Sequence, residues 1–101
     1  MANVPAHVTI LSSRAHREIT EAWNWYEDRQ PGLGDRFLKE VRARIEKIEQ
    51  PLKDTPTRFR SYKKTPVPVF PFLIIYRINK KKKLIRIVSV FHTSLNPQKK
   101  Y

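Results

Sequence analysis

Hydrophobic positions follow two different periods along this chain, and the changes of period mark its predicted elements. The segment His7 to Leu11 alternates and is rich in β-branched residues, which predicts a first strand. Apolar residues then recur at helical spacing from Arg14 to Asp28 and from Asp35 to Gln50, which predicts two amphipathic helices. Their stripes are Ala15, Ile19, Ala22, Trp23 and Tyr26 in the first helix, and Phe37, Leu38, Val41, Ile45 and Ile48 in the second.

Turn and cap residues separate these elements. Ser12 or Ser13 can cap the first helix, and Pro51 ends the second. Gln30 to Gly34 breaks the helical pattern with turn formers, so the two helices are expected to form an antiparallel hairpin. Trp25 falls off the first stripe, which predicts a position at the hairpin tip, over the second helix, or in solvent.

The second half of the chain carries the strongest strand signals. Residues 72–78 and 84–91 are nearly continuous apolar runs, and residues 79–83 link them as a β-hairpin. The proline-rich stretch before them leaves room for an edge strand from Arg58 to Lys64. The predicted fold class is therefore α+β, with βααβββ order, in which an N-terminal strand and a helical hairpin pack on an antiparallel sheet. A length of 101 residues fits one domain, 1–101, with a loosely held tail from about residue 93.

Several kinds of site have no support in the sequence. There is no cysteine, which excludes disulfides and Cys-based metal sites and fits a reducing compartment. The only two glycines are Gly32 and Gly34, so a Gly-rich nucleotide-binding loop is not expected. The N-terminus has no leader pattern and no apolar run is long enough to span a membrane. We therefore expect a cytoplasmic protein without a cofactor or a metal.

Net charge changes the picture, because it is carried by one half of the chain. Residues 1–50 hold eight Lys or Arg against eight Asp or Glu, whereas residues 51–101 hold thirteen against Asp54 alone. The second half thus carries the whole net charge of +12. Such an asymmetry predicts an anionic partner, either a nucleic acid, a ribosome or an acidic protein. A solubilising surface is the alternative, although such surfaces usually mix both signs.

Polar residues that interrupt the apolar strands are the candidates for function. Metal-free cleavage of RNA needs a base, an acid and cations near the phosphate, for which His92, Arg77 and Lys63 are the candidate catalytic residues. His92 has a structural alternative as a hydrogen-bonding residue, and Arg77 and Arg86 have one as solvated edge residues. Phe59 and Tyr62 are interleaved with basic residues, a pattern that suits phosphate contact with base stacking. The candidates for binding a nucleic acid or another target are Arg58, Arg60, Tyr62, Lys63, Lys64, Arg77 and Arg86.

Four stretches resemble the RelE/ParE superfamily of toxins from type II toxin-antitoxin systems, also called plasmid-stabilisation proteins. They are Trp25-Tyr26-Glu27, Pro31-Gly32-Leu33-Gly34-Asp35-Arg36-Phe37-Leu38, Phe70 to Arg77, and Phe91-His92-Thr93-Ser94 with Asn96-Pro97. In order and spacing they cover roughly residues 8 to 98. The chain departs from its relatives at Lys63 and at Leu95, where arginine is common, so a phosphate clamp at position 95 is absent.

The resemblance implies the βααβββ fold, a cognate acidic antitoxin that lies across the basic side of the sheet, and growth inhibition. Members of this superfamily act either on the translating ribosome, where they cut mRNA, or on DNA gyrase. We expect a toxin that arrests translation by ribosome-dependent mRNA cleavage, as a metal-independent endoribonuclease. The alternatives are a gyrase inhibitor without catalytic activity, and a non-toxic RNA-binding module.

Overall fold

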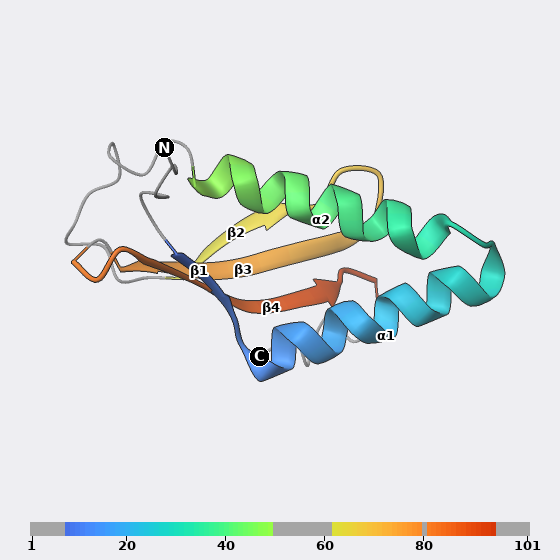
Figure 1. The fold of residues 1–101 in the computed structure, drawn as a ribbon, viewed down its shortest axis with the longest axis horizontal. Coiled ribbons are helices and arrows are strands. Elements are labelled where there is room, and N and C mark those ends of the chain that lie inside the picture. Colours follow the sequence, from blue (N-terminus) through green and yellow to red (C-terminus); the bar gives the residue numbers. More distant parts are fainter. Residues whose placement is uncertain (1–7, 50–61, 80, 95–101) are drawn as a thin grey trace, which may run out of the picture.

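The chain folds as a helical hairpin over one face of a mixed β-sheet (Figure 1). The computed structural model describes residues 8–49, 62–79 and 81–94. The elements follow the order β1 (Val8–Leu11), α1 (Ser13–Arg29), α2 (Leu33–Glu49), β2 (Lys63–Pro66), β3 (Phe72–Asn79) and β4 (Leu84–His92). The predicted α+β class, the βααβββ order and the helical hairpin are confirmed. Within the described residues no helix is long and apolar enough to cross a membrane.

The described strands lie in the order β1-β4-β3-β2. β2 pairs with β3 and β3 with β4 in antiparallel fashion, as the hairpin pattern predicts. β1 differs from the predicted antiparallel arrangement, because it pairs with β4 in parallel. A parallel pair needs a long crossover connection, which the helical hairpin supplies here. The apolar runs β3 and β4 are therefore the central strands, and β2 lies at an edge, slightly later in the chain than the predicted strand 58–64.

Side chains from the start of α1 cover the part of β4 that β1 leaves unpaired. β1 is paired only with the first half of β4. Beyond it, the hydroxyl of Ser12 donates to the carbonyl of Val88 at 2.7 Å. The carboxylate of Glu18 accepts from the hydroxyl of Ser89 at 2.7 Å and from the backbone N–H of Val90 at 2.9 Å. These bonds satisfy backbone groups that an uncovered strand edge would leave open.

An aromatic cluster joins the two helices to the sheet. The ring of Phe37 in α2 is fully buried. It lies 5.5 Å from the ring of Tyr26 in α1, 5.4 Å from that of Phe70 and 4.8 Å from that of Phe72 in β3. The predicted stripes of both helices face this core. Trp23 is the exception, since it is only half-buried and lies outside the buried cluster.

The end of the helical hairpin is held by one carboxylate and one indole. Glu27 accepts from the backbone N–H of Gly32 at 3.1 Å and from that of Gly34 at 2.8 Å. The indole N–H of Trp23 donates to the carboxylate of Asp35 at 3.0 Å. The first amides of α2 thus find acceptors on α1, which fixes the angle between the two helices.

Candidate functional site

One face of the sheet lies under the helices, and among the described elements no helix covers the other (Figure 1). Because side chains alternate along a strand, the strand register assigns each residue to one of the two faces. Ile74, Ile85 and Ile87 belong to the buried core and so mark the face under the helices. The second face, which we call the open sheet face, includes Val8, Ile10, Tyr62, Lys64, Ile75, Arg77, Leu84, Arg86 and Phe91, of which Ile75 is buried.

The centre of the open sheet face is a row of four side chains that crosses the sheet. Arg77 of β3 lies directly opposite Arg86 of β4, and Arg86 lies beside Ile10 of β1. On the other flank, the guanidinium carbon of Arg77 lies 5.2 Å from the ring centroid of Tyr62, a cation-π contact. Across the sheet, the row therefore consists of one aromatic, two cationic and one aliphatic side chain. Both arginines are exposed.

Among the described residues, the two arginines have no acidic neighbour. Strands β1 to β4 contain no Asp or Glu, and the described carboxylates all lie on α1 and α2. Within the described part of the chain, neither guanidinium has a carboxylate at salt-bridge distance. Like charges that face each other across two strands are destabilising. The free protein thus keeps a cationic pair that no described group of its own neutralises.

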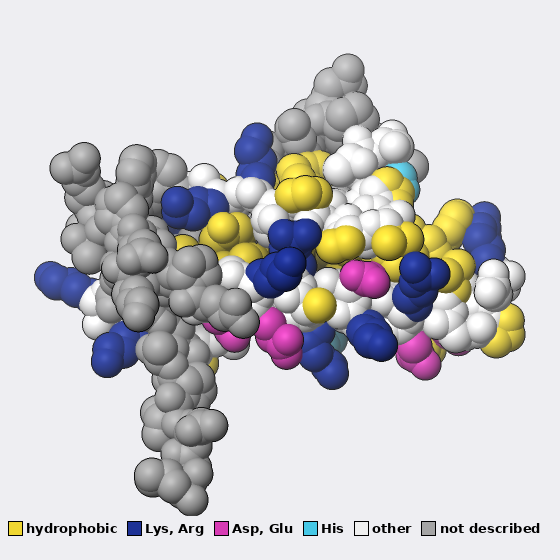
Figure 2. All heavy atoms as spheres, turned by 90° about the horizontal axis from the view of Figure 1, so that it is seen from above, with side chains coloured by type: hydrophobic (Ala, Val, Ile, Leu, Met, Phe, Trp, Pro, Cys, Tyr) yellow, Lys and Arg dark blue, Asp and Glu magenta, His cyan; other side chains and the backbone are white. Residues whose placement is uncertain are grey.

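The open sheet face is also apolar. Val8 and Ile10 are exposed, with 54% and 38% of their surface accessible. Leu84, which is paired with Val8, and Phe91 are half-buried. Figure 2, which views the molecule from the α2 side of Figure 1, shows cationic and hydrophobic side chains interspersed, with Asp and Glu in the middle and lower part of that view. The predicted basic side of the sheet is therefore a mixture of cations and aliphatic groups.

The three candidate catalytic residues do not lie together. His92 is half-buried, its ring packs edge-on against Phe72 at 5.0 Å, and its Nδ1 accepts from the backbone N–H of Ser94 at 3.0 Å. Arg77 is five residues from Phe72 along β3, which is roughly 16 Å at the rise of a strand. Lys63 is paired with Tyr76, so it lies on the opposite face from Arg77.

Tyr76, the neighbour of Lys63 in the sheet, is a poor candidate for a base. It is packed partly buried against the core. Burial raises the pKa of Tyr76 above its usual value of 10.0. Its phenol therefore keeps its proton at neutral pH.

The predicted basic cluster is divided by the sheet. Lys63 and Lys64 are consecutive residues of β2, so their side chains point to opposite faces. Lys64 and Tyr62 join the open sheet face, whereas Lys63 lies on the side of the helices. Arg58 and Arg60 lie outside the described residues, as do Phe59 and Leu95.

Comparison with known proteins places the chain in a family. Residues 9–97 match the family model described as "ParE toxin of type II toxin-antitoxin system, parDE". The chain belongs to this family. Among solved structures, it is similar to a chain from the chromosomal ParDE toxin-antitoxin system of P. aeruginosa, with a TM-score of 0.70 and 12% identity over 88% of this chain and 98% of that one. At that identity the likeness concerns the fold alone. No curated protein matches.

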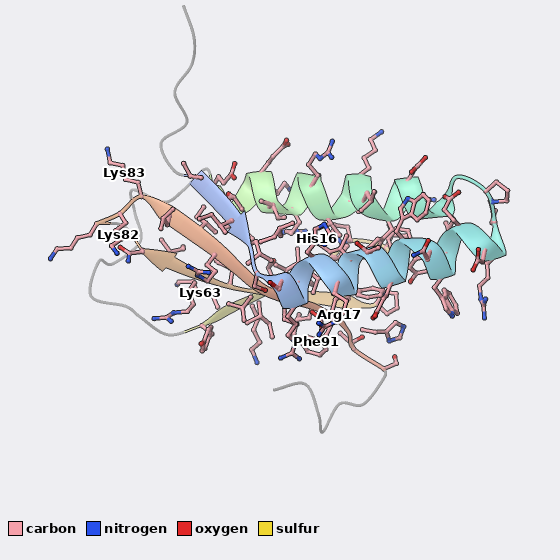
Figure 3. The ribbon with its side chains drawn as sticks, turned by 60° about the horizontal axis from the view of Figure 1, so that its bottom comes forward. His16, Arg17, Lys63, Lys82, Lys83 and Phe91 are labelled. Atoms are coloured by element: carbon pink, nitrogen blue, oxygen red, sulfur yellow. The ribbon has the colours of Figure 1, made fainter. Side chains whose placement is uncertain are left out.

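The toxin carries a second group of exposed residues at the end of α1. Trp25 has 52% of its surface accessible, which agrees with the predicted position at the hairpin tip or in solvent. The guanidinium carbon of Arg29 lies 3.6 Å from the centroid of its ring. At the opposite end, Lys82 and Lys83 lie in the turn between β3 and β4, far from Phe91 (Figure 3).

Sequence reasoning named Arg77 and Arg86 but missed that they face each other. The signal was available, since a β-hairpin with its turn after Asn79 pairs that residue with Leu84 and hence Arg77 with Arg86. It assigned no role to Glu18, whose carboxylate accepts hydrogen bonds from Ser89 and from the backbone of β4. No local pattern could have indicated that contact, because 71 residues separate Glu18 from Ser89.

Proposed function

We propose that this ParE-family toxin inhibits DNA gyrase by binding to it, without catalysis, and that an acidic antitoxin neutralises it. The observation that carries the proposal is the separation of the candidate catalytic groups. Arg77 and Lys63 lie on opposite faces of the sheet, and His92 lies near the far end of β4. Membership of the ParE family supports gyrase as the target, because toxins of the ParE type act on gyrase, whereas other members of the wider superfamily act on the ribosome.

Cleavage of mRNA at the ribosome is the rival function. In-line attack by a 2′-hydroxyl needs a base, an acid and cationic groups that converge on one phosphate. In the free toxin the Nδ1 of His92 is already occupied by the N–H of Ser94. For the toxin to cleave mRNA, His92, Arg77 and Lys63 would all have to move toward one phosphate on the ribosome. A binding inhibitor needs only an exposed surface.

An acidic antitoxin follows from the charge of the toxin. The net charge of +12 lies entirely in the second half of the chain, which includes β2, β3 and β4. Opposite charge on the antitoxin accelerates association and favours the right partner over others. The repulsion between cationic residues in the free toxin is relieved when carboxylates of such a partner bind to them.

The proposal is tested with purified toxin, gyrase and plasmid DNA. We expect the toxin to inhibit supercoiling and to increase the amount of DNA that gyrase leaves cleaved, in proportion to toxin concentration. A parallel reaction with translating ribosomes and a labelled message should leave the message intact. Unaffected gyrase together with a cut message would contradict the proposal and support the rival. Neither effect, from toxin that is folded by circular dichroism, would support a non-toxic RNA-binding protein.

A further inference from the structure

Two exposed apolar side chains lie toward the end of the molecule that is opposite the turn between β3 and β4. Trp25 is near the end of α1, and Val69 is in the loop between β2 and β3 (Figure 1). They have 52% and 70% of their surface accessible. The ring of Tyr26 connects them, since it lies 5.2 Å from the ring of Trp25 and 5.0 Å from that of Phe70, the residue after Val69.

We propose that Trp25, Arg29 and Val69, which we call the distal tip, form the surface through which the toxin contacts gyrase. The inference rests on the proposed function, because it names the contact surface for that target. The distal tip is separate from the row of arginines on the open sheet face. The aromatic cluster beneath the tip includes Phe72, and Arg77 lies roughly 16 Å further along β3.

The indole of Trp25 is held in place although it is exposed. Its ring packs edge-on against Tyr26, which is itself buried in the core. On its other contact, the guanidinium carbon of Arg29 lies 3.6 Å from the centroid of the indole. Tryptophan and arginine are enriched among the residues that dominate the affinity of protein interfaces. A side chain that is already ordered also loses less entropy on binding, so this pair is prepared to enter a pocket on a partner.

Val69 is held in a backbone conformation that costs stability. Its φ is 76°, and it follows Pro68 in a bend of the chain, a position that glycine or asparagine normally occupies. The bend is closed by the N–H of Val67, which donates to the carbonyl of Phe72 at 3.0 Å, and by the buried side chain of Phe70. Strained residues of this kind are concentrated at functional sites. An exposed valine gains little from packing in the free toxin, which indicates that a partner contacts it.

The composition of the distal tip favours a protein surface as the partner. Single-stranded nucleic acids are bound by several stacking rings along a basic groove, whereas the tip combines one exposed ring with one cation and one aliphatic group. A second copy of the toxin would bring together two chains with a net charge of +12 each, which opposes self-association. The guanidinium of Arg29 favours a carboxylate. The matching surface on gyrase should therefore be an apolar pocket with a carboxylate at its rim.

The test measures the binding of purified toxin to the gyrase holoenzyme by biolayer interferometry at fixed salt. Trp25→Ala should weaken binding by about 30-fold, the effect typical of a tryptophan at the centre of an interface. Arg29→Gln should weaken it by about tenfold, the range of charged hydrogen bonds. Lys82→Gln is the matched control for charge, because it removes a cation from the exposed turn at the opposite end (Figure 3). It should change the affinity by less than about threefold, the effect of net charge alone.

Stability separates a binding role from a structural one. Val69→Asn should raise the urea midpoint of the free toxin, because asparagine adopts a positive φ more readily than valine. The same variant should bind gyrase more weakly by about threefold or more, because it loses an apolar group from the contact. Weaker binding by a more stable variant cannot result from misfolding. Trp25→Ala and Arg29→Gln should keep the circular dichroism spectrum of the unmodified toxin.

The possible failures are distinguishable. If the unmodified toxin does not bind gyrase, the proposed function is wrong and the inference fails with it. If it binds gyrase and the three tip variants bind equally well, the distal tip is not the contact surface, while the proposed function stands. Equal losses in Arg29→Gln and Lys82→Gln, with no loss in Trp25→Ala, would reduce the effect to net charge. A larger loss in Tyr62→Ala than in Trp25→Ala would place the contact on the open sheet face and overturn the inference.

Discussion

Gly34→Ala gives a sharp test of how the two helices meet. Gly34 lies in the first turn of α2 and is buried against α1. A Cβ at this position would lie 2.7 Å from the Cγ of Glu27, 2.7 Å from the backbone oxygen of Trp23 and 2.9 Å from the Cδ1 of its ring. The clash with a backbone atom cannot be relieved by a change of rotamer, so α1 and α2 must move apart.

The sign of the effect is what makes this substitution informative. In an open helical position, replacing glycine by alanine stabilises by up to about 1 kcal/mol. At Gly34, overpacking costs about 1–3 kcal/mol, and separating the helices weakens the bonds from Glu27 to the first amides of α2 by about 1 kcal/mol. We expect a net loss of about 2–3 kcal/mol in the free energy of unfolding. In a domain of this size that corresponds to a fall in Tm of roughly 10–20 °C.

Gly32→Ala is the matched control. Gly32 has a φ of +90°, and nothing lies within 4 Å of the Cβ that alanine would add. Its replacement should cost roughly 1–2 kcal/mol through backbone strain alone. Urea unfolding followed by circular dichroism compares both variants with the unmodified toxin. If Gly34→Ala were neutral or stabilising, the described contact between α1 and α2 would be wrong.

Three further variants test other parts of the structure. Glu18→Gln should lower the free energy of unfolding by about 1–3 kcal/mol, because the carboxylate of Glu18 accepts hydrogen bonds from Ser89 and from the backbone of β4. The change is measured as a lower urea midpoint. Val69→Asn should raise the free energy of unfolding by about 1 kcal/mol, because Val69 has a φ of 76°, which asparagine adopts more readily than valine, and 70% of its surface is exposed. An unchanged urea midpoint would contradict the presence of backbone strain at this position. Burial raises the pKa of Tyr26 and Tyr76 above 10.0, so the folded state holds these protons longer and loses that stability as pH rises through the folded-state values. Above about pH 10 the urea midpoint should therefore fall more steeply in the unmodified toxin than in the double variant with phenylalanine at both positions.

Elements with strong local patterns were predictable from the sequence. The apolar runs 72–78 and 84–91 became β3 and β4 with ends shifted by one residue. Ser12 caps α1 as expected, because its hydroxyl accepts from the N–H of Ala15. The parallel pairing of β1 with β4 was not predictable, since it joins segments about 76 residues apart and depends on how the whole helical hairpin packs.

The candidate site was predictable in its composition and not in its geometry. Arg77 and Arg86 were identified because each interrupts an apolar strand, and the structure adds that they face each other beside Tyr62. The alternation of β2 separates Lys63 from Lys64, although the two are adjacent in the sequence. A cluster of basic residues in the sequence therefore does not indicate a cluster on the surface unless the strand boundaries are known.

The central claim is that the toxin acts by binding and not by catalysis. The most direct measurement is growth after inducible expression of the Lys63→Gln/His92→Gln double variant in a bacterial host without the antitoxin, with reporters for DNA damage and for protein synthesis. We predict that the variant still arrests growth and induces the DNA-damage response, as the unmodified toxin does. The claim would be contradicted if the unmodified toxin first stopped protein synthesis and the folded variant no longer inhibited growth.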